Sequence, residues 1–563
     1  MLGPFTGFTA PLHPDNVRPK HAMYYGTDLG WSYRHAGQIQ FLFGDTIASE
    51  SGDAIDRIHD DAFGYIDLAQ WSDASRISRG HVPPLRLAQI PGTSRLAGLD
   101  PGVPMEALKT PLGGFSNGVN EFGLFLTGKP QGCRVDADCS NGLTCDTGLG
   151  YLFEPPEKAA GLTLPCVDGA AGCAASTLAG GKGSELTDSG LCVDHTSTIT
   201  GTSEFGRVGS YGIRHLVGMR SADDPRMYTN TREWLTNKFT NVAARTVADF
   251  VPERGAGRAK QDYRNIPDAR TARRVFLWGR PGFVGINARQ STLGLYFAYV
   301  DMPDGGSFSW QLRYYTGADA HGVPRFSTSE RDAAPLDLDS SQAGIQSLET
   351  HDIVQQMSIA WIEPLRKWVM FYGGGISEFP IPGLGPTCGV LEIFARRECK
   401  DVVVGNGALR MRTADDPWGP WTPPQDLLVG GFADHRPLEN QYAPGGVLHH
   451  PGCTGANCEA PSAQMRKGDY GWFYGANIIE EWTRPVRSAP IGSGADSGGT
   501  DSGGTVGLGA AGSGAIGGGA IGSGVEVIWN VSTWNPYRLV LLKTRITPPS
   551  RPAIEGPGSK ESR

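Results

Sequence analysis

Short β-type runs separated by turn residues make up most of this chain. β-branched and aromatic residues gather in runs of about four to eight residues, with Gly, Pro, Asn and Asp between them. Helical periodicity is almost absent. The runs are Ile39–Phe43, Phe122–Thr127, Val275–Trp278, Leu293–Val300, Trp310–Tyr315, Met357–Trp361, Lys367–Tyr372, Ala408–Arg412, Tyr470–Tyr474, Val525–Asn530 and Tyr537–Lys543. The pattern predicts an all-β sandwich, barrel or propeller, and no clean repeat gives a number of blades.

Composition supports a folded core and narrows the choice of partners. Hydrophobic residues make up 39% and charged residues 19% of the chain, and 79 Gly with 40 Pro suit many tight turns. A net charge of −8 argues against a nucleic-acid partner and against an anionic membrane surface. No run of about twenty apolar residues predicts a membrane span. This net charge neither favours nor opposes the binding of a neutral glycan.

The ten cysteines form local groups of even number. Two pairs are Cys388 with Cys399 and Cys453 with Cys458, and the remaining six lie close together: Cys133, Cys139, Cys145, Cys166, Cys173 and Cys192. This usage favours disulfides in an oxidising compartment over zinc, which prefers CxxC-type spacings with nearby His. Six cysteines allow fifteen pairings, so the connectivity stays open.

Most of the chain is expected to form one domain, residues 1–549, with two insertions. Residues 131–194 hold the cysteine cluster and predict a small disulfide-stabilised lobe. Residues 491–524 are rich in Gly and Ser and predict a flexible loop rather than a phosphate-binding loop, because no helix is expected to follow. Residues 550–563 are expected to be a disordered tail.

The cysteines also bear on localisation. The first residues lack the basic and apolar regions of a signal peptide. The predicted disulfides favour a secreted or extracytoplasmic protein. Either its signal has been removed, which is the favoured interpretation, or its export does not depend on such a signal.

Two carboxylates occupy matching positions on either side of a predicted hairpin. Gly37 in the turn Ala36-Gly37 suits a two-residue hairpin. This register places Asp28 directly opposite Asp45, with Cβ atoms about 5 Å apart. Two carboxylates at this distance repel each other, which raises one pKa and keeps the other group ionised. Glycoside hydrolysis needs this division between an acid and a base or nucleophile.

Structural roles for the same residues stay open. Asp28 can cap a turn, Asp45 can bind loop amides, and the two together can bind a cation. A shift of one residue in the register would also separate the two faces.

The ordered motifs resemble the family catalogued as domain of unknown function 4185, linked to glycoside hydrolase family 183, the endo-D-arabinanases. The most specific pieces are GTDLG (Gly26–Gly30) with FLFGDT (Phe41–Thr46), and STWNPY (Ser532–Tyr537). The resemblance covers about residues 20–545 without the insertions, and its other pieces are Asp60-Asp61-Ala62, Arg274–Gly279, Leu295–Val300, Arg313–Asp319, Met357–Gly375 and Arg412–Trp421.

The resemblance implies a five-bladed β-propeller with its site at the central channel. It implies that Asp28 and Asp45 are the catalytic carboxylates, with Asp61 as a third acidic group nearby. The chain departs from the family pattern at Gln355 and Gln356, where relatives often carry a Glu just before the Ser of the MSIAW segment. This departure bears on the substrate or the activity.

Further substrate-binding candidates lie near these motifs or carry suitable chemistry. Sugar rings stack on aromatic faces, Arg binds hydroxyls or orients carboxylates, and an acidic side chain can join the site. Beside Asp61, the candidates are Trp31, Trp534, Arg412 and Glu204. Core packing, and for Arg412 a structural ion pair, are the alternatives.

Two functions remain at this stage. The first is a monomeric endo-D-arabinanase that acts on polysaccharides such as arabinogalactan or lipoarabinomannan, with no cofactor and no metal. The second is a carbohydrate-binding propeller without catalysis. The sequence shows no motif for the arginine triad that a sialidase-type propeller needs.

Overall fold

A computed structural model describes the β-rich parts of the chain. It covers residues 1–6, 10–11, 24–44, 47–48, 62–87, 110–126, 132–133, 135–138, 144–146, 190–193, 213–220, 228–236, 238–239, 241–247, 273–280, 295–302, 311–338, 356–373, 409–428, 472–486, 505–507, 524–534 and 538–547. Within them the chain is mostly β-strand with few helices. Each predicted strand run overlaps an observed strand, and several runs extend past the described residues.

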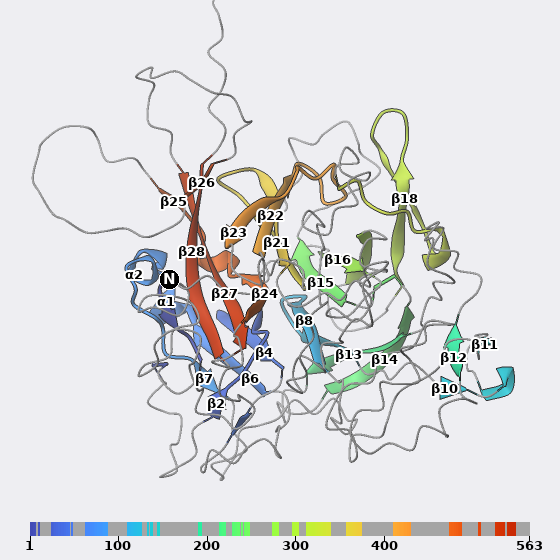
Figure 1. Ribbon diagram of the computed structural model, residues 1–563, viewed down its shortest axis with the longest axis horizontal. Helices are drawn as coiled ribbons and strands as arrows, with labels where there is room; N and C mark the ends of the chain where they lie inside the picture. Colours follow the sequence, from blue (N-terminus) through green and yellow to red (C-terminus); the bar gives the residue numbers. More distant parts are fainter. Residues whose placement is uncertain are drawn as a thin grey trace, which may run out of the picture.

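Four entirely antiparallel sheets lie in a ring like the blades of a β-propeller (Figure 1). The first contains β3 (Trp31–His35), β4 (Gln38–Phe43), β6 (Ala62–Asp67) and β7 (Arg86–Leu87). The second contains β8 (Thr110–Ser116), β9 (Glu121–Leu126), β13 (Ile213–Arg220) and β14 (Tyr228–Thr236). The third contains β15 (Asn241–Val247), β16 (Arg273–Arg280), β17 (Tyr296–Met302), β18 (Arg313–Ala318) and β19 (Pro324–Ser327). The fourth contains β20 (Met357–Ile362), β21 (Lys367–Gly373), β22 (Leu409–Ala414) and β23 (Gln425–Leu428).

A mixed sheet joins strands from both ends of the described chain. It contains β1 (Gly3–Pro4), β24 (Trp472–Ile478), β25 (Arg484–Val486), β26 (Thr505–Gly507), β27 (Gly524–Trp534) and β28 (Arg538–Thr547), and β26 runs parallel to β28. The short strand β1 pairs with β28, so residues near position 4 lie beside residues near position 540. This sheet therefore connects the beginning of the chain to its last strands.

The remaining elements are small. The pair β2 (Tyr24–Gly26) and β5 (Ile47–Ala48) precedes and follows the first hairpin, and β10 (Gly132–Cys133), β11 (Thr144–Asp146) and β12 (Gly190–Val193) form a three-stranded sheet. In that sheet the backbone of Cys145 lies opposite that of Cys192. The helices are α1 (Leu68–Trp71), α2 (Ala74–Ser78) and the 3-10 turns η2 (Asp136–Asp138), η4 (Glu330–Asp332) and η9 (Glu480–Trp482). None of the described helices is long and apolar enough to cross a membrane.

The first hairpin has the predicted register. Strands β3 and β4 pair from His35–Gln38 to Trp31–Leu42, with Ala36 (φ 46°) and Gly37 (φ 75°) as the two turn residues. Positive φ at both positions is the type I′ geometry that matches strand twist. The sequence prediction of this register is confirmed.

Aromatic and aliphatic side chains between neighbouring sheets form the core. One cluster lies between the second and third sheets and includes Phe239, Leu277 and Tyr314. Another lies between the third and fourth sheets and includes Trp278 and Trp368, whose ring centroids are 5.2 Å apart. Burial of such rings supplies the main driving force for folding.

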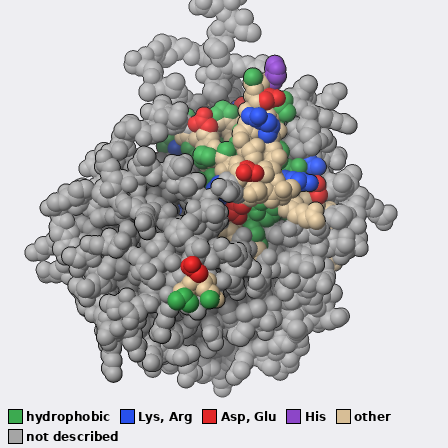
Figure 2. Space-filling model, turned by 90° about the vertical axis from the view of Figure 1, so that its right-hand side faces the viewer, with side chains coloured by type: hydrophobic (Ala, Val, Ile, Leu, Met, Phe, Trp, Pro, Cys, Tyr) green, Lys and Arg blue, Asp and Glu red, His purple; other side chains and the backbone are tan. Residues whose placement is uncertain are grey.

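Surface charge is mixed where the chain is described. On the face in Figure 2, acidic and basic side chains lie interspersed rather than in blocks of one sign. Exposed ion pairs of this kind include Lys367 with Asp415 and Arg410 with Asp426, at 2.7 and 3.0 Å. Because exposed pairs contribute little to stability, the fold depends mainly on the packing between sheets.

Candidate functional site at the start of the inner strands

Asp28 lies on a turn with unusual backbone geometry, directly before the innermost strand of the first sheet. The next two residues, Leu29 and Gly30, have φ values of 65° and 62°. Glycine accepts this conformation easily, whereas a leucine at positive φ is uncommon and costs free energy. Leu29 is only 2% exposed, so its side chain is held by packing. Backbone strain of this kind is often found at functional sites.

Side chains from the mixed sheet hold the turn in place. Ser532 Oγ accepts a hydrogen bond from the Leu29 backbone N–H at 2.7 Å. The Asn530 amide donates to the Leu29 carbonyl at 3.2 Å, and the Asn477 amide donates to the Gly30 carbonyl at 2.9 Å. All three side chains are buried on β24 or β27. The turn is therefore fixed by residues more than 400 positions away in the sequence.

The carboxylate of Asp28 is also oriented. Tyr474 donates a hydrogen bond from its hydroxyl to Asp28 Oδ2 at 2.8 Å. The other oxygen lies so close to Gly44 that a Cβ atom built there would be 2.3 Å from Asp28 Oδ1. Gly44 donates its N–H to the Asp28 carbonyl at 3.1 Å. A half-buried carboxylate held this way is suited to transferring a proton or stabilising positive charge at a fixed position.

A further polar residue lies close to this turn. Gln356 precedes β20, is 4% exposed, and has its side-chain oxygen beside Gly475, which follows Tyr474 in the sequence. The starts of β3, β20 and β24 thus meet at one place, which we call the Asp28 site.

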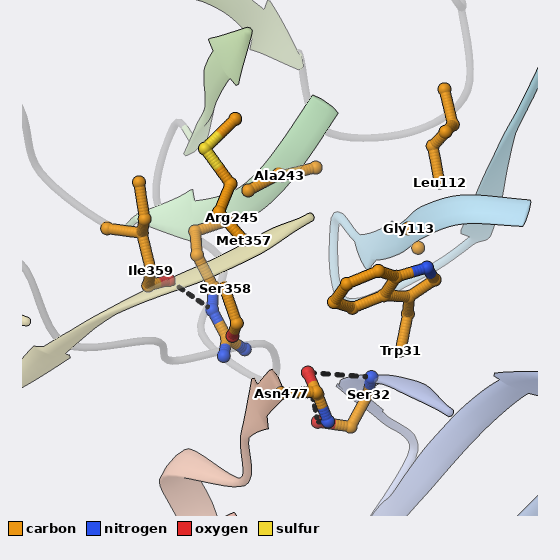
Figure 3. Close-up of a pocket in the computed structure, with 12 residues that line it drawn as sticks. Trp31, Ser32, Leu112, Gly113, Ala243, Arg245, Met357, Ser358, Ile359 and Asn477 are labelled. Atoms are coloured by element: carbon orange, nitrogen blue, oxygen red, sulfur yellow. Dashed lines mark hydrogen bonds between the residues drawn. The ribbon is translucent and has the colours of Figure 1, made fainter. Parts of the chain in front are cut away.

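A small cavity lies between the inner strands of the described part of the chain. A cavity of about 20 Å³, room for one water molecule, is lined by residues of β3, β8, β15, β20 and β24. Figure 3 shows Trp31, Arg245 and Asn477 around it. Arg245 spans the cavity wall by donating to the carbonyls of Ile359 and Ile478 at 2.8 and 3.0 Å. This cavity is too small to hold a sugar ring.

Three predicted substrate-binding residues lie in described strands. Trp31 begins β3 and is 5% exposed, with its ring at the wall of the inner cavity. Arg412 is buried in β22, where it donates to the Tyr372 hydroxyl at 2.8 Å and to backbone carbonyls. Trp534 ends β27, and its backbone pairs with the first residue of β24. A sugar-binding role for each of them stays a prediction.

The other predicted site residues fall outside the described residues. They are Asp45, Asp61 and Glu204. Two backbone pairs lie on either side of Asp28 and Asp45 in the sequence: Gly26 with Ile47, and Trp31 with Leu42. Both pairs keep the register of the first hairpin. The opposition of the two aspartates stays a prediction.

Sequence reasoning missed most of the residues that support Asp28. Tyr474 and Asn530 lie in predicted strand runs with no other role, and Asn477 lies outside every predicted run. Ser532 opens the STWNPY motif, which was singled out without a role for this serine. Nothing in the local sequence shows that these side chains meet residues 28–30, because the contact joins strands that are more than 400 residues away.

The fold defines a β-propeller-like protein with an ordered carboxylate at one end of the ring. No protein-family model matches the chain, and no curated protein matches it. Among the described residues, no three His, Cys, Asp or Glu side chains gather in a way that could bind a metal ion.

Proposed function

We propose that this chain is a secreted, monomeric glycoside hydrolase that cleaves D-arabinofuranosyl linkages within arabinans such as arabinogalactan and lipoarabinomannan. The observation that carries the proposal is Asp28, a half-buried carboxylate that Tyr474 orients on a strained turn. Strained backbone and an oriented carboxylate occur together at many active sites. The choice of D-arabinofuranose rests on the sequence resemblance around Gly26–Gly30 and Ser532–Tyr537.

In the proposed mechanism two carboxylates share the chemistry. One protonates the oxygen of the leaving sugar, and the other attacks the anomeric carbon or activates a water molecule. Asp28 takes one of these roles and Asp45 the other. Tyr474 keeps the Asp28 carboxylate in one orientation, so the side chain loses less conformational entropy when the substrate binds. The substrate binds at Asp28 and not in the inner cavity, which holds only about 20 Å³.

We further propose that the mixed sheet is the fifth blade of a five-bladed propeller. Support comes from its innermost strand, β24, which contacts both β20 and β3. Two core clusters also link this sheet to its neighbours. Trp529 packs on Phe371 of the fourth sheet, and Leu539 shares a cluster with Phe41 of the first sheet.

The test compares the purified protein with three variants on mycobacterial arabinogalactan. Wild type and Asp67→Asn are expected to release arabino-oligosaccharides, whereas Asp28→Asn and Asp45→Asn are expected to lose at least about 10³-fold in rate. Asp67 is the matched control, because it lies in the first sheet and hydrogen-bonds to Gln38 at its hairpin end. Circular dichroism confirms that each variant is folded. A folded Asp28→Asn variant that cuts at the wild-type rate would overturn the proposal.

A carbohydrate-binding propeller without catalysis is the second candidate. The observation that favours it is Gln356, an uncharged side chain beside the Asp28 turn where relatives often carry an acidic residue. This alternative predicts that wild type and Asp28→Asn bind the polymer equally and that neither releases fragments.

A further inference from the structure

The small sheet of β10, β11 and β12 carries part of the cysteine cluster (Figure 1). Strand β12 lies in the middle, with β10 on one side and β11 on the other. Each strand contains one cysteine: Cys133 in β10, Cys145 in β11 and Cys192 in β12. The sequence left the pairing of these cysteines open, and the register of the strands restricts it.

The three cysteines belong to one face of this sheet. Cys145 lies directly opposite Cys192 in the antiparallel pair of β11 and β12. Cys133 lies opposite Gly190, which is two residues before Cys192 on the same strand. Because the faces of a strand alternate with a period of two, positions 190 and 192 share a face. Positions 133 and 145, which lie opposite them, therefore share it too.

Distance distinguishes between the two candidate partners of Cys192 in this sheet. A disulfide joins residues whose Cα atoms lie about 4.4–6.8 Å apart. Residues directly opposite each other in an antiparallel pair have Cα atoms about 4.5 or 5.5 Å apart, which is within this range. Diagonal neighbours are about 7–8 Å apart, which is outside it. The register therefore favours Cys145 over Cys133.

We propose that Cys145 and Cys192 form a disulfide bond that joins the two ends of residues 146–191. Its formation removes two protons and two electrons from the two thiols. An external disulfide, such as oxidised glutathione, accepts them by thiol–disulfide exchange and becomes two thiols. The bond stabilises the sheet by restricting the unfolded chain between the two cysteines. The other four cysteines of the cluster then have three pairings among themselves instead of the fifteen that six allow.

The insertion that carries this sheet leaves and re-enters the ring at neighbouring strands. Strand β9 ends at Leu126 and β13 begins at Ile213, and the two strands pair with Leu126 opposite His215. The second sheet is thus closed across the base of the insertion by its own backbone hydrogen bonds. We therefore expect the ring to fold without the disulfide, which makes cysteine variants suitable for a test.

The first test is peptide mapping of the full chain, either secreted into an oxidising compartment or refolded with reduced and oxidised glutathione. Free thiols are blocked with iodoacetamide in urea, and the protein is digested with trypsin and chymotrypsin without reductant. Mass spectrometry is expected to find Cys145 and Cys192 in one pair of linked peptides that separates on reduction. A link from Cys192 to any other cysteine, or a free thiol at both positions, would overturn the proposal.

Cys145→Ser and Cys133→Ser form a matched pair of variants. Both replace a cysteine on the same face of the sheet, one directly opposite Cys192 and the other diagonal to it. Iodoacetamide in urea is expected to label Cys192 fully in Cys145→Ser and not at all in Cys133→Ser. The reverse pattern would identify Cys133 as the partner, and the proposed pairing would then be wrong.

Tryptophan fluorescence shows whether the ring of each variant is folded. All 13 tryptophans lie outside residues 127–212, so their signal reports on the rest of the chain. We expect the urea midpoint of both variants to equal that of wild type. If a variant does not fold, the peptide map of the wild-type protein decides by itself. None of these measurements uses arabinan, so their outcome is independent of the proposed hydrolase activity.

Discussion

The Asp28 turn shows how single residues create an ordered carboxylate. Leu29 adopts a backbone conformation that costs about 1 kcal/mol for a residue with a side chain. Its complete burial and the hydrogen bonds from Ser532 and Asn530 offset this cost. As a result, backbone geometry as well as Tyr474 sets the direction of the Asp28 carboxylate.

Gly44 allows this approach, and its replacement gives a residue-level test. In Gly44→Ala the new Cβ would lie 2.3 Å from Asp28 Oδ1 and 2.9 Å from Leu29 Cδ1, so the carboxylate must move. We expect the free energy of unfolding to fall by about 1–3 kcal/mol. The rate of hydrolysis per folded molecule is expected to fall about 100-fold.

Gly37→Ala is the control for this substitution. Gly37 has a positive φ, but no atom lies within 4 Å of the Cβ that alanine would add. We expect a loss of about 1 kcal/mol in stability and unchanged kcat/KM. Full activity in folded Gly44→Ala would show that the position of Asp28 does not matter for hydrolysis.

Local chemistry alone pointed to Asp28 but not to its supports. The GTDLG motif and the hairpin turn drew attention to this residue because both are short-range signals. Tyr474 and Asn477 carry no such signal, since their role depends on which strands become neighbours. Arg412 shows the converse. Its sequence position left open sugar binding, orientation of a carboxylate or a structural ion pair, and the structure buries its guanidinium against backbone carbonyls and the Tyr372 hydroxyl.

At the scale of elements, turn chemistry and alternation predicted the strands well. The Ala36-Gly37 turn gave the register of β3 and β4, because few residues tolerate positive φ at both positions. The predicted limits differ from the observed ones by a few residues. For example, the run Leu293–Val300 corresponds to β17, Tyr296–Met302. Sheet membership could not be predicted, since hydrophobic runs do not specify their partners.

Glu526 joins several elements, and its hydrogen bonds predict how the free energy of unfolding changes at acidic pH. It lies in β27 and accepts hydrogen bonds from Ser78 of α2 at 2.7 Å and from Arg484 of β25 at 2.8 Å. Partial burial raises the pKa of its carboxyl, but these hydrogen bonds and the charges of Arg484 and Lys543 outweigh it and lower the pKa below its ordinary value of 4.5. The ionised carboxylate therefore stabilises the folded state above about pH 4.5.

This stabilisation is lost as the pH falls through the lowered pKa. We expect Glu526→Gln to be less stable than wild type at neutral pH and to lose less stability below pH 4.5. Urea unfolding at several pH values measures the difference. Asp415→Asn, which removes an exposed partner of Lys367, is the control and should follow the wild-type curve closely. Parallel curves for Glu526→Gln and wild type would contradict the linkage.

At the scale of the whole molecule, the first residues complete the mixed sheet. Phe5 is fully buried, and its ring centroid lies 5.1 Å from that of Phe41. The Phe5 N–H donates a hydrogen bond to the Leu539 carbonyl at 2.9 Å. The Thr6 hydroxyl accepts from the Leu539 N–H at 2.8 Å. The contact joins the first sheet to β28.

Deletion of residues 1–6 is expected to lower the free energy of unfolding by about 3–5 kcal/mol, as for loss of a buried phenylalanine. Phe5→Ala separates the contribution of the ring from that of the β1 backbone. Activity of the truncated protein should fall at lower urea concentration than in wild type. An unchanged urea midpoint after the deletion would show that β1 does not stabilise the ring.

The hydrogen bonds from Tyr474 and Ser532 to residues 28 and 29 have a consequence for protein synthesis. The two ends of these bonds are 446 and 503 residues apart. The ribosome therefore makes the GTDLG segment at least 446 residues before the side chains that orient its aspartate. The growing chain cannot position Asp28 until β24 and β27 have been made.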